Sequence, residues 1–401
     1  MNKFKRLGPG LLFAGAAIGV SHLVYSTRAG ADYGWGLLWA FLIINIFKYP
    51  FFEFGPRYAV ATGETLLDGY KKIGKKYLWF YAILNTANMF TIQAAVTIVT
   101  AGLAAHFFGI SVNLAIWGSI IIIICSLLLV IGKYSLLDKL MKFIIIILSF
   151  CTFLALILAF YNSNEFPSLV QVLPQGPGLL FLIAFMGWMP APMDISIWHS
   201  IWSVEKQKEI KNINLKETLY DFNVGYVTTI LLGLLFMGLG ALVMFNTEEE
   251  FSDKGLVFAS QLIDLYTSNL GESFGGIISL AAFTTMFSTT ITTLDASPRA
   301  FSKTIQLINK DDKDYYLFFL LILSLGTIAI FLFLQSEMGF LVQVATVLSF
   351  LTTPFFAWIN LKLVTSSFMP QKSQPKKELV IFSWFGLLFL SAFTVGYLIS
   401  L

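Results

Sequence analysis

Apolar runs long enough to cross a lipid bilayer recur along almost the whole sequence. A membrane-spanning helix needs about 20 predominantly apolar residues, and by that criterion the sequence predicts eleven spans. They lie at residues 9–28, 36–55, 78–104, 112–132, 140–161, 178–201, 222–245, 275–297, 315–334, 339–366 and 380–400. Only 12% of the residues are charged, about half the share in soluble domains. We therefore predict an all-α integral membrane protein.

The positions of Lys and Arg predict how the chain is oriented. If the N-terminus is cytoplasmic, 23 of the 26 basic residues fall on the cytoplasmic side, Arg28 and Lys254 fall outside, and Lys48 lies within a span near its inner end. Such an excess of basic residues in cytoplasmic loops follows the positive-inside rule. We predict a multi-pass protein of the cytoplasmic membrane with its C-terminus outside. Because the basic residues are membrane anchors, no nucleic-acid partner is expected.

Two spans contain residues that interrupt helices. Residues 186–200, MGWMPAPMDISIWHS, include Pro190 and Pro192, and a proline in a regular helix interior costs about 3 kcal/mol. Residues 14–27, AGAAIGVSHLVYST, contain the weak helix former Gly19 followed by a serine and a histidine. Open backbone at membrane depth is tolerated only where it is buried in protein or lines a cavity. Both spans are therefore predicted to break inside the membrane.

The two interrupted spans occupy corresponding places in the sequence. Transporters built from inverted repeats often interrupt the first helix of each repeat near the bilayer midplane, where substrate and ions bind. The sequence thus predicts one transmembrane domain over residues 1–401, with a first repeat at 9–161, a second repeat at 178–366 and an extra eleventh helix at 380–400. This is the 5+5 arrangement of the LeuT type, with helices 1 and 6 broken.

Ionisable and sulfur-containing side chains accompany both predicted breaks. A charged residue such as Asp194 costs at least about 2.5–3.5 kcal/mol near mid-membrane and by default marks a functional site. The imidazole of His22 can ligate a metal or carry a proton, and thioethers favour soft transition metals. The alternatives are a structural ion pair, an interhelical hydrogen bond and simple packing. The predicted substrate or metal site comprises Gly19, Ser21, His22, Met189, Met193 and Asp194.

Hydroxyl side chains crowd the eighth span at residues 284–298, TTMFSTTITTLDASP. They predict a coupling-ion site for a monovalent cation, shared with the open part of the first span and formed by Ser288, Thr289 and Thr292. The alternative is that these hydroxyl groups bond only to their own helix. His199 is a candidate proton carrier on the exit path or, alternatively, an interfacial residue.

The sequence contains little that indicates an enzyme or an ATP-driven pump. The metalloprotease pattern HExxH and the phosphate-binding loop GxxxxGK[ST] are absent. GESFG at 271–275 matches the serine elbow GxSxG, but no strand is expected before it. We predict a secondary transporter with no resident cofactor, rather than an enzyme.

Several stretches resemble the natural resistance-associated macrophage protein (Nramp) family of divalent-metal transporters. AGADYGWGLLW at 29–39 is similar to the family's AGASFGYKLLW, and RYAVATGETLLDGYKK at 57–72 resembles its RLGIVTGKDLAQACR. KYSLLDKLMKFIIII at 133–147, WHS at 198–200 and FSTTITTLDA at 287–296 are further echoes. The resemblance implies inward transport of a divalent cation by alternating access. The alternative is a sodium- or proton-coupled symporter of a small organic solute such as an amino acid.

The family's metal site does not carry over intact. Its DPGN motif falls on residues 19–22, so that its acidic ligand is missing and His22 stands in place of asparagine. Its MPH motif falls on residues 192–194, where Asp194 replaces histidine. The family's acidic proton-relay positions fall on Asn85, Ile92 and Ala95. The resemblance therefore implies a divergent member in which the ligands and the route of a coupling proton or sodium ion are rewritten.

Overall fold

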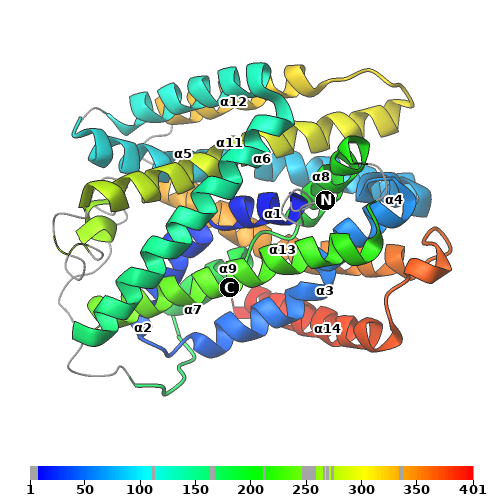
Figure 1. The fold of residues 1–401 in the computed structure, drawn as a ribbon. Coiled ribbons are helices and arrows are strands. Elements are labelled where there is room, and N and C mark those ends of the chain that lie inside the picture. The colour runs from blue at the N-terminus through cyan, green and yellow to red at the C-terminus, as the bar shows by residue number, and fades with distance from the viewer. Residues whose placement is uncertain are drawn as a thin grey trace.

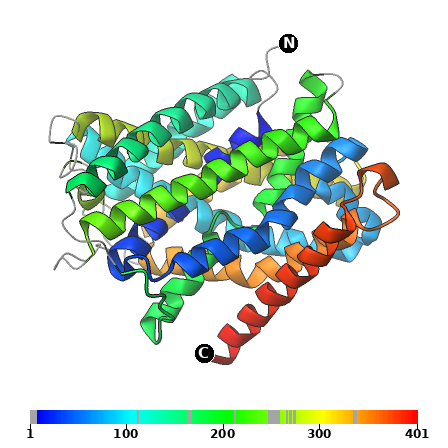
Figure 2. The same cartoon turned by 60° about the horizontal axis from the view of Figure 1, so that its bottom comes forward.

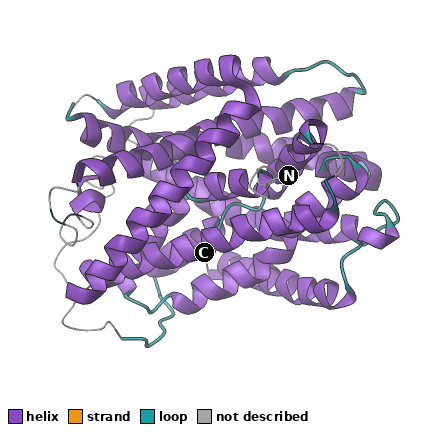
Figure 3. Ribbon diagram, viewed as in Figure 1, coloured by secondary structure: helices purple, strands orange, loops and turns teal. Residues whose placement is uncertain are grey.

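The computed structural model describes residues 8–110, 113–162, 168–210, 213–245, 259–264, 267, 271, 275–333 and 338–400. Regular structure in these ranges is entirely helical (Figure 3), so the predicted all-α class is confirmed. In chain order the helices are α1 (Pro9–Ala17), η2 (Ser21–Ser26), α2 (Thr27–Tyr33), α3 (Leu38–Thr62), α4 (Leu66–Ile73), α5 (Lys75–Phe108), α6 (Leu114–Asn162), α7 (Pro177–Trp188), α8 (Ile195–Glu209), α9 (Leu215–Val243), α11 (Gly275–Asn309), α12 (Tyr316–Phe333), α13 (Met338–Val364), η5 (Gln371–Ser373) and α14 (Lys377–Ser400).

The described part of the chain contains eight helices long and apolar enough to cross a membrane, or nine if the bent pair at the N-terminus is one span. The eleven predicted spans are more numerous for two reasons. The predicted sixth span is divided into α7 and α8, each shorter than a full span. The predicted fourth and fifth spans lie on the one continuous helix α6, whose apolar parts are Leu114–Ile131 and Ile146–Tyr161.

The first predicted break is present. Helix α1 ends at Ala17, and the helix that resumes at Ser21 is bent from it by 51°. Its first turns, η2, are wound as a π-helix rather than an α-helix. The Gly19 N–H turns back to the carbonyl of Ala17 at 2.9 Å, which replaces the regular helical bond there. The break therefore falls at the glycine that the sequence indicated.

The second predicted break is also present and is wider. Helix α7 ends at Trp188, α8 begins at Ile195, and residues 189–194 between them are not helical. Pro190 and Pro192 lie in this segment and have no backbone N–H to continue the helix. Helix α8 starts directly after Asp194, which occupies its N-cap position.

The broken helices lie inside the bundle. Helices α1 and α2 pack against α9, α3 packs against α8, and α13 packs against α5 and α7. Helix α1 is in the middle of the view, with other helices above and below it (Figure 1). Helix α14 lies at the edge beside α3 and α13 (Figure 2). Large exposed apolar side chains are frequent on α6, α12 and α14, as expected for surfaces that face lipid.

Candidate functional site

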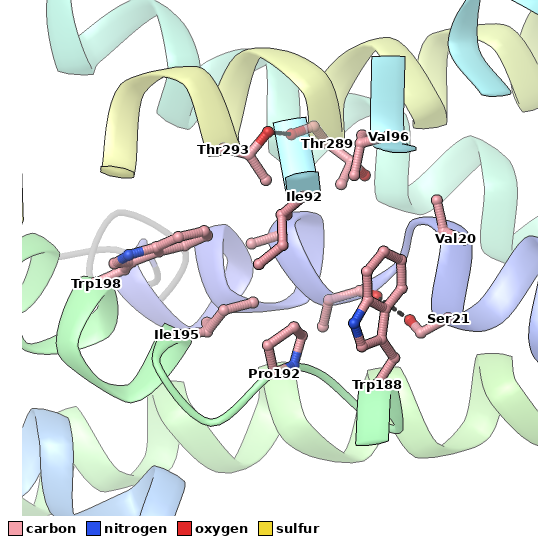
Figure 4. A pocket seen from close by; sticks show the side chains of 12 residues that line it. Val20, Ser21, Ile92, Val96, Trp188, Pro192, Ile195, Trp198, Thr289 and Thr293 are labelled. Carbon is pink, nitrogen blue, oxygen red and sulfur yellow. Dashed lines mark hydrogen bonds between the residues drawn. The ribbon is translucent and has the colours of Figure 1, made fainter. Parts of the chain in front are cut away.

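A small cavity lies between the two breaks (Figure 4). Its volume is about 30 Å³, which is enough for one ordered water or a small ion. The first break contributes Ala17 and Ser21 to its wall, and the second contributes Trp188 and Pro192; Ile92 of α5 and Thr289 of α11 close two further sides. The cavity is therefore where the interruptions of the two repeats meet, although its wall is largely apolar.

Ser21 connects the two breaks. Its Oγ lies 3.4 Å from the carbonyl oxygen of Pro190, 2.6 Å from that of Ala17 and 2.7 Å from Nδ1 of His22. A hydroxyl group has one proton and two acceptor lone pairs, so it donates to one of these partners at a time. Ser21 can therefore exchange a bond within the first break for a bond to the second break.

His22 is fully buried but faces α9 rather than the cavity. Its Nε2 is 2.9 Å from the carbonyl oxygen of Thr229, and its Nδ1 is 2.7 Å from Ser21 Oγ. Because a carbonyl can only accept, Nε2 carries the proton, and in the neutral ring Nδ1 accepts from the serine. Both nitrogens are thus engaged, Nδ1 within η2 and Nε2 in a bond between η2 and α9. In this conformation His22 is not placed to bind a cation in the cavity, and its role as a ligand stays a prediction.

Asp194 has a buried oxygen that is available for a ligand. Its side chain is 5% exposed, and Oδ1 has no hydrogen-bond partner among the described residues. The carboxylate lies at the N-terminus of α8, where the helix dipole favours negative charge. Lys48, Tyr70 and Tyr81 are close enough to interact with it electrostatically. Because burying an unpaired charge is costly, this oxygen is a candidate ligand for a cation.

Lys48 of α3 contacts the second break, and sequence analysis does not select it as a site residue. Its side chain is fully buried, and Nζ donates toward four backbone carbonyls of the second break. The distances are 2.9 Å to Met186, 2.7 Å to Gly187, 3.0 Å to Met189 and 3.3 Å to Ala191. These carbonyls belong to the C-terminal end of α7 and the segment after it, where the interruption leaves them without helical partners. A lysine in the middle of an apolar run, IFKYPF, was the available signal.

The two predicted methionine ligands and Gly19 have other roles in this conformation. Met189 and Met193 are buried, but neither side chain lines the cavity. Met189 contributes its backbone carbonyl to Lys48. A Cβ added to Gly19 would lie 2.7 Å from Cγ2 of Thr289, so glycine permits the close approach of the first break to α11.

Of the predicted coupling-ion residues, Thr289 reaches the first break. Its Oγ1 lies 3.2 Å from the carbonyl oxygen of Gly15 and 3.1 Å from that of Ile18. Thr292 donates to the carbonyl of Ser288 in its own helix at 2.8 Å, and both of these residues are buried. The open end of α1 and α11 therefore share a cluster of oxygen atoms around Thr289.

His199 is enclosed by aromatic rings. It is fully buried, its ring centre lies 5.6 Å from that of Phe13 and 5.7 Å from that of Phe222, and neither ring nitrogen has a partner among the described residues. It is thus a core residue rather than an interfacial one, and its role as a proton carrier stays a prediction.

The described residues contain no group of three or more His, Cys, Asp and Glu side chains that could hold a metal ion. The oxygen atoms at the two breaks are those of backbone carbonyls, the Ser21 hydroxyl and the carboxylate of Asp194. Oxygen ligands of this kind suit hard cations such as Mg²⁺, Ca²⁺ and Mn²⁺.

Comparisons with known proteins agree with this architecture. A family model described as natural resistance-associated macrophage protein-like matches residues 10–400. An uncharacterized protein of Pasteurella multocida is 37% identical over 402 residues, which cover 98% of this chain and 92% of the relative. A manganese transporter of Eremococcus coleocola superposes with a TM-score of 0.75 at 14% identity, over 96% of this chain and 84% of that one. The protein MhsT, in complex with L-phenylalanine, gives a TM-score of 0.64 at 14% identity, over 96% and 98% of the two chains. At this identity the two structures indicate a shared fold alone.

Proposed function

The chain belongs to the Nramp family, which is a family of transporters rather than enzymes, and we propose that it moves a divalent cation across a membrane by alternating access. The observation that carries the proposal is the set of four carbonyl oxygens, at the end of α7 and in the second break, that converge on one positive charge, the ammonium group of Lys48. A backbone arranged to hold a cation, beside a buried carboxylate with a free oxygen, suits cation cargo.

The proposed binding set combines residues of both breaks. Asp194 supplies the negative charge, Ser21 supplies a hydroxyl group that already reaches the second break, and the carbonyls supply the remaining oxygens. Because these donors are oxygen atoms, the proposal favours Mn²⁺ or Mg²⁺ over softer metals. The His22 imidazole and the thioethers of Met189 and Met193 stay predicted ligands that would join only after a rearrangement of the breaks.

The moving parts in this proposal are the two broken spans. Rotation of α1, η2 and α2 against α7 and α8 would open the cavity to one side and then to the other. The oxygen cluster around Thr289 is the proposed place for a coupling sodium ion. The proposed location is the cytoplasmic membrane, with the N-terminus inside.

The alternative cargo, a small organic solute, has less support. The cavity of about 30 Å³ is roughly a tenth of the smallest volume usual for pockets that hold small organic ligands. In this conformation the cavity, which Ser21 lines and Asp194 does not, has room for an ion but not for an amino acid. The divalent cation is therefore the better supported cargo.

Uptake by the purified protein in sealed vesicles tests the proposal. We expect saturable accumulation of radioactive Mn²⁺ or Mg²⁺ that a panel of amino acids does not inhibit. Accumulation of an amino acid, with no uptake of any divalent cation, would replace the proposal with the organic-solute alternative.

A further inference from the structure

Lys48 holds a positive charge at the centre of the protein. It lies on α3, whereas its four carbonyl partners belong to the end of α7 and the segment that follows. An ammonium group has three protons and no acceptor, so four oxygens within 3.3 Å satisfy all of its donors. The contacts resemble the shell of carbonyls that a protein places around a bound metal cation, with the ammonium at its centre.

The charge balance of this region involves the same two residues. Asp194 is buried in the second break and interacts electrostatically with Lys48, but the two do not form a hydrogen-bonded ion pair among the described contacts. A buried charge is tolerated in a membrane only if another charge or polar groups compensate it. While the ammonium is on the carbonyls, the carboxylate has a counter-charge nearby and its Oδ1 remains free.

We infer that Lys48 is the built-in occupant of the cation site: its ammonium group takes the cargo's place on the carbonyls when no cargo is bound, and must leave them before a divalent cation can bind. This inference rests on the proposed function. Lys48 positions the carbonyls at the end of α7 and competes with the cargo for the same oxygens. When no cargo is bound, its positive charge balances the negative charge of Asp194.

Two consequences follow from competition. The apparent dissociation constant of the cargo is the intrinsic constant divided by the fraction of molecules in which Lys48 has left the carbonyls. The native protein therefore binds its cargo more weakly than its oxygen ligands alone would allow. In addition, when the empty site turns back to the side where cargo binds, the ammonium group of Lys48 balances the charge of Asp194. Net transport therefore does not need another cation to fill the empty site.

A titration of the purified full-length protein with Mn²⁺ tests the first consequence. Lys48→Met removes the ammonium group and all of its donors while keeping an unbranched side chain. We expect it to bind Mn²⁺ at least about ten-fold more tightly, within the range of roughly 5- to 150-fold that is usual for coupled ligands. Lys48→Arg keeps the charge and should not gain affinity. Lys303→Met removes a lysine whose Nζ pairs with Asp68 at 2.9 Å, away from both breaks, and should leave binding unchanged.

If Lys48 only capped the end of α7, its removal would not increase the affinity for Mn²⁺. Transport assays distinguish this capping role from the proposed role as occupant of the cation site. In vesicles, Lys48→Met should retain exchange of Mn²⁺ for Mn²⁺, in which the carrier returns loaded. It should lose most net uptake into vesicles free of Mn²⁺, because the empty carrier then has an uncompensated Asp194. If Lys48→Met elutes from a sizing column as aggregate, Lys48→Gln replaces it. The glutamine removes the charge but keeps two donors, so we expect a smaller gain in Mn²⁺ affinity and the same loss of net uptake.

The outcomes distinguish this inference from the proposed function. If the native protein binds Mn²⁺ and the uncharged variant binds it with equal affinity, the inference is overturned while the proposed function stands. If neither protein binds Mn²⁺ or Mg²⁺, both are overturned. Binding by the uncharged variant alone supports Lys48 as occupant and contradicts transport by the native chain.

Discussion

At the scale of single residues, the sequence is most informative where a charged side chain lies within an apolar span. Asp194 was recognised because a carboxylate near mid-membrane is costly, and the structure places it beside the second break with a free oxygen. Lys48 was missed because its role depends on carbonyls that lie about 140 positions away along the chain. Backbone groups have no sequence signature, so such a partnership is visible only in three dimensions.

His22 gives a prediction at this scale. The variant His22→Ala loses the bonds to the Thr229 carbonyl and to Ser21. Since a hydrogen bond between membrane helices contributes about 0.6 to 2 kcal/mol, we expect a lower midpoint of thermal unfolding in detergent. His22→Gln keeps a donor and should recover part of the loss. Unchanged stability with an altered order of ion preference would instead make His22 a ligand.

At the scale of elements, the positions of both helix breaks can be predicted from the sequence, but the backbone geometry at the breaks cannot. Two prolines in one span and a glycine followed by polar residues in another mark where helices cannot continue. The π-helical winding of η2 and the continuity of α6 through two apolar runs depend on packing between helices. A count of apolar residues does not reveal whether the backbone remains helical between two apolar runs.

Gly19 tests the contact between the first break and α11. The variant Gly19→Ala places a Cβ against Cγ2 of Thr289 at 2.7 Å, and overpacking of this kind costs about 1–3 kcal/mol. We expect Mn²⁺ uptake to fall by roughly five-fold or more, with the protein still folded. The double variant Gly19→Ala/Thr289→Ser lacks Cγ2 but keeps the hydroxyl, so it should regain uptake. Failure of the serine to restore any uptake would mean that this close approach is not what limits the variant.

At the scale of the whole molecule, loops predicted on the same side of the membrane contact one another. Gly36, at the outer end of the predicted second span, accepts a backbone hydrogen bond of 2.9 Å from Val172, which is in a loop predicted outside. On the opposite side, Arg57 donates to the Ser373 carbonyl at 2.9 Å. The charge pattern of the sequence therefore agrees with the arrangement of loops in space, although which side is cytoplasmic stays a proposal.

Labelling of single cysteines in intact cells tests that orientation. With Cys125 and Cys151 replaced by alanine, Gln171→Cys should react with an impermeant maleimide added outside the cell. Ser373→Cys should react only after the membrane is permeabilised. The reverse pattern would invert the proposed topology and the direction in which the basic loops face.

Uptake by Asp194→Asn is the most direct test of a cation site where the two broken helices meet. The change keeps the size of the side chain and removes the one charge that the second break offers to a cargo. Asp32→Asn, at an exposed carboxylate paired with Arg28, is the matched control and should transport as the native protein does. We predict that Asp194→Asn, folded and inserted in vesicles, loses most of its saturable uptake of radioactive Mn²⁺. Uptake kinetics equal to those of the native protein would contradict the account.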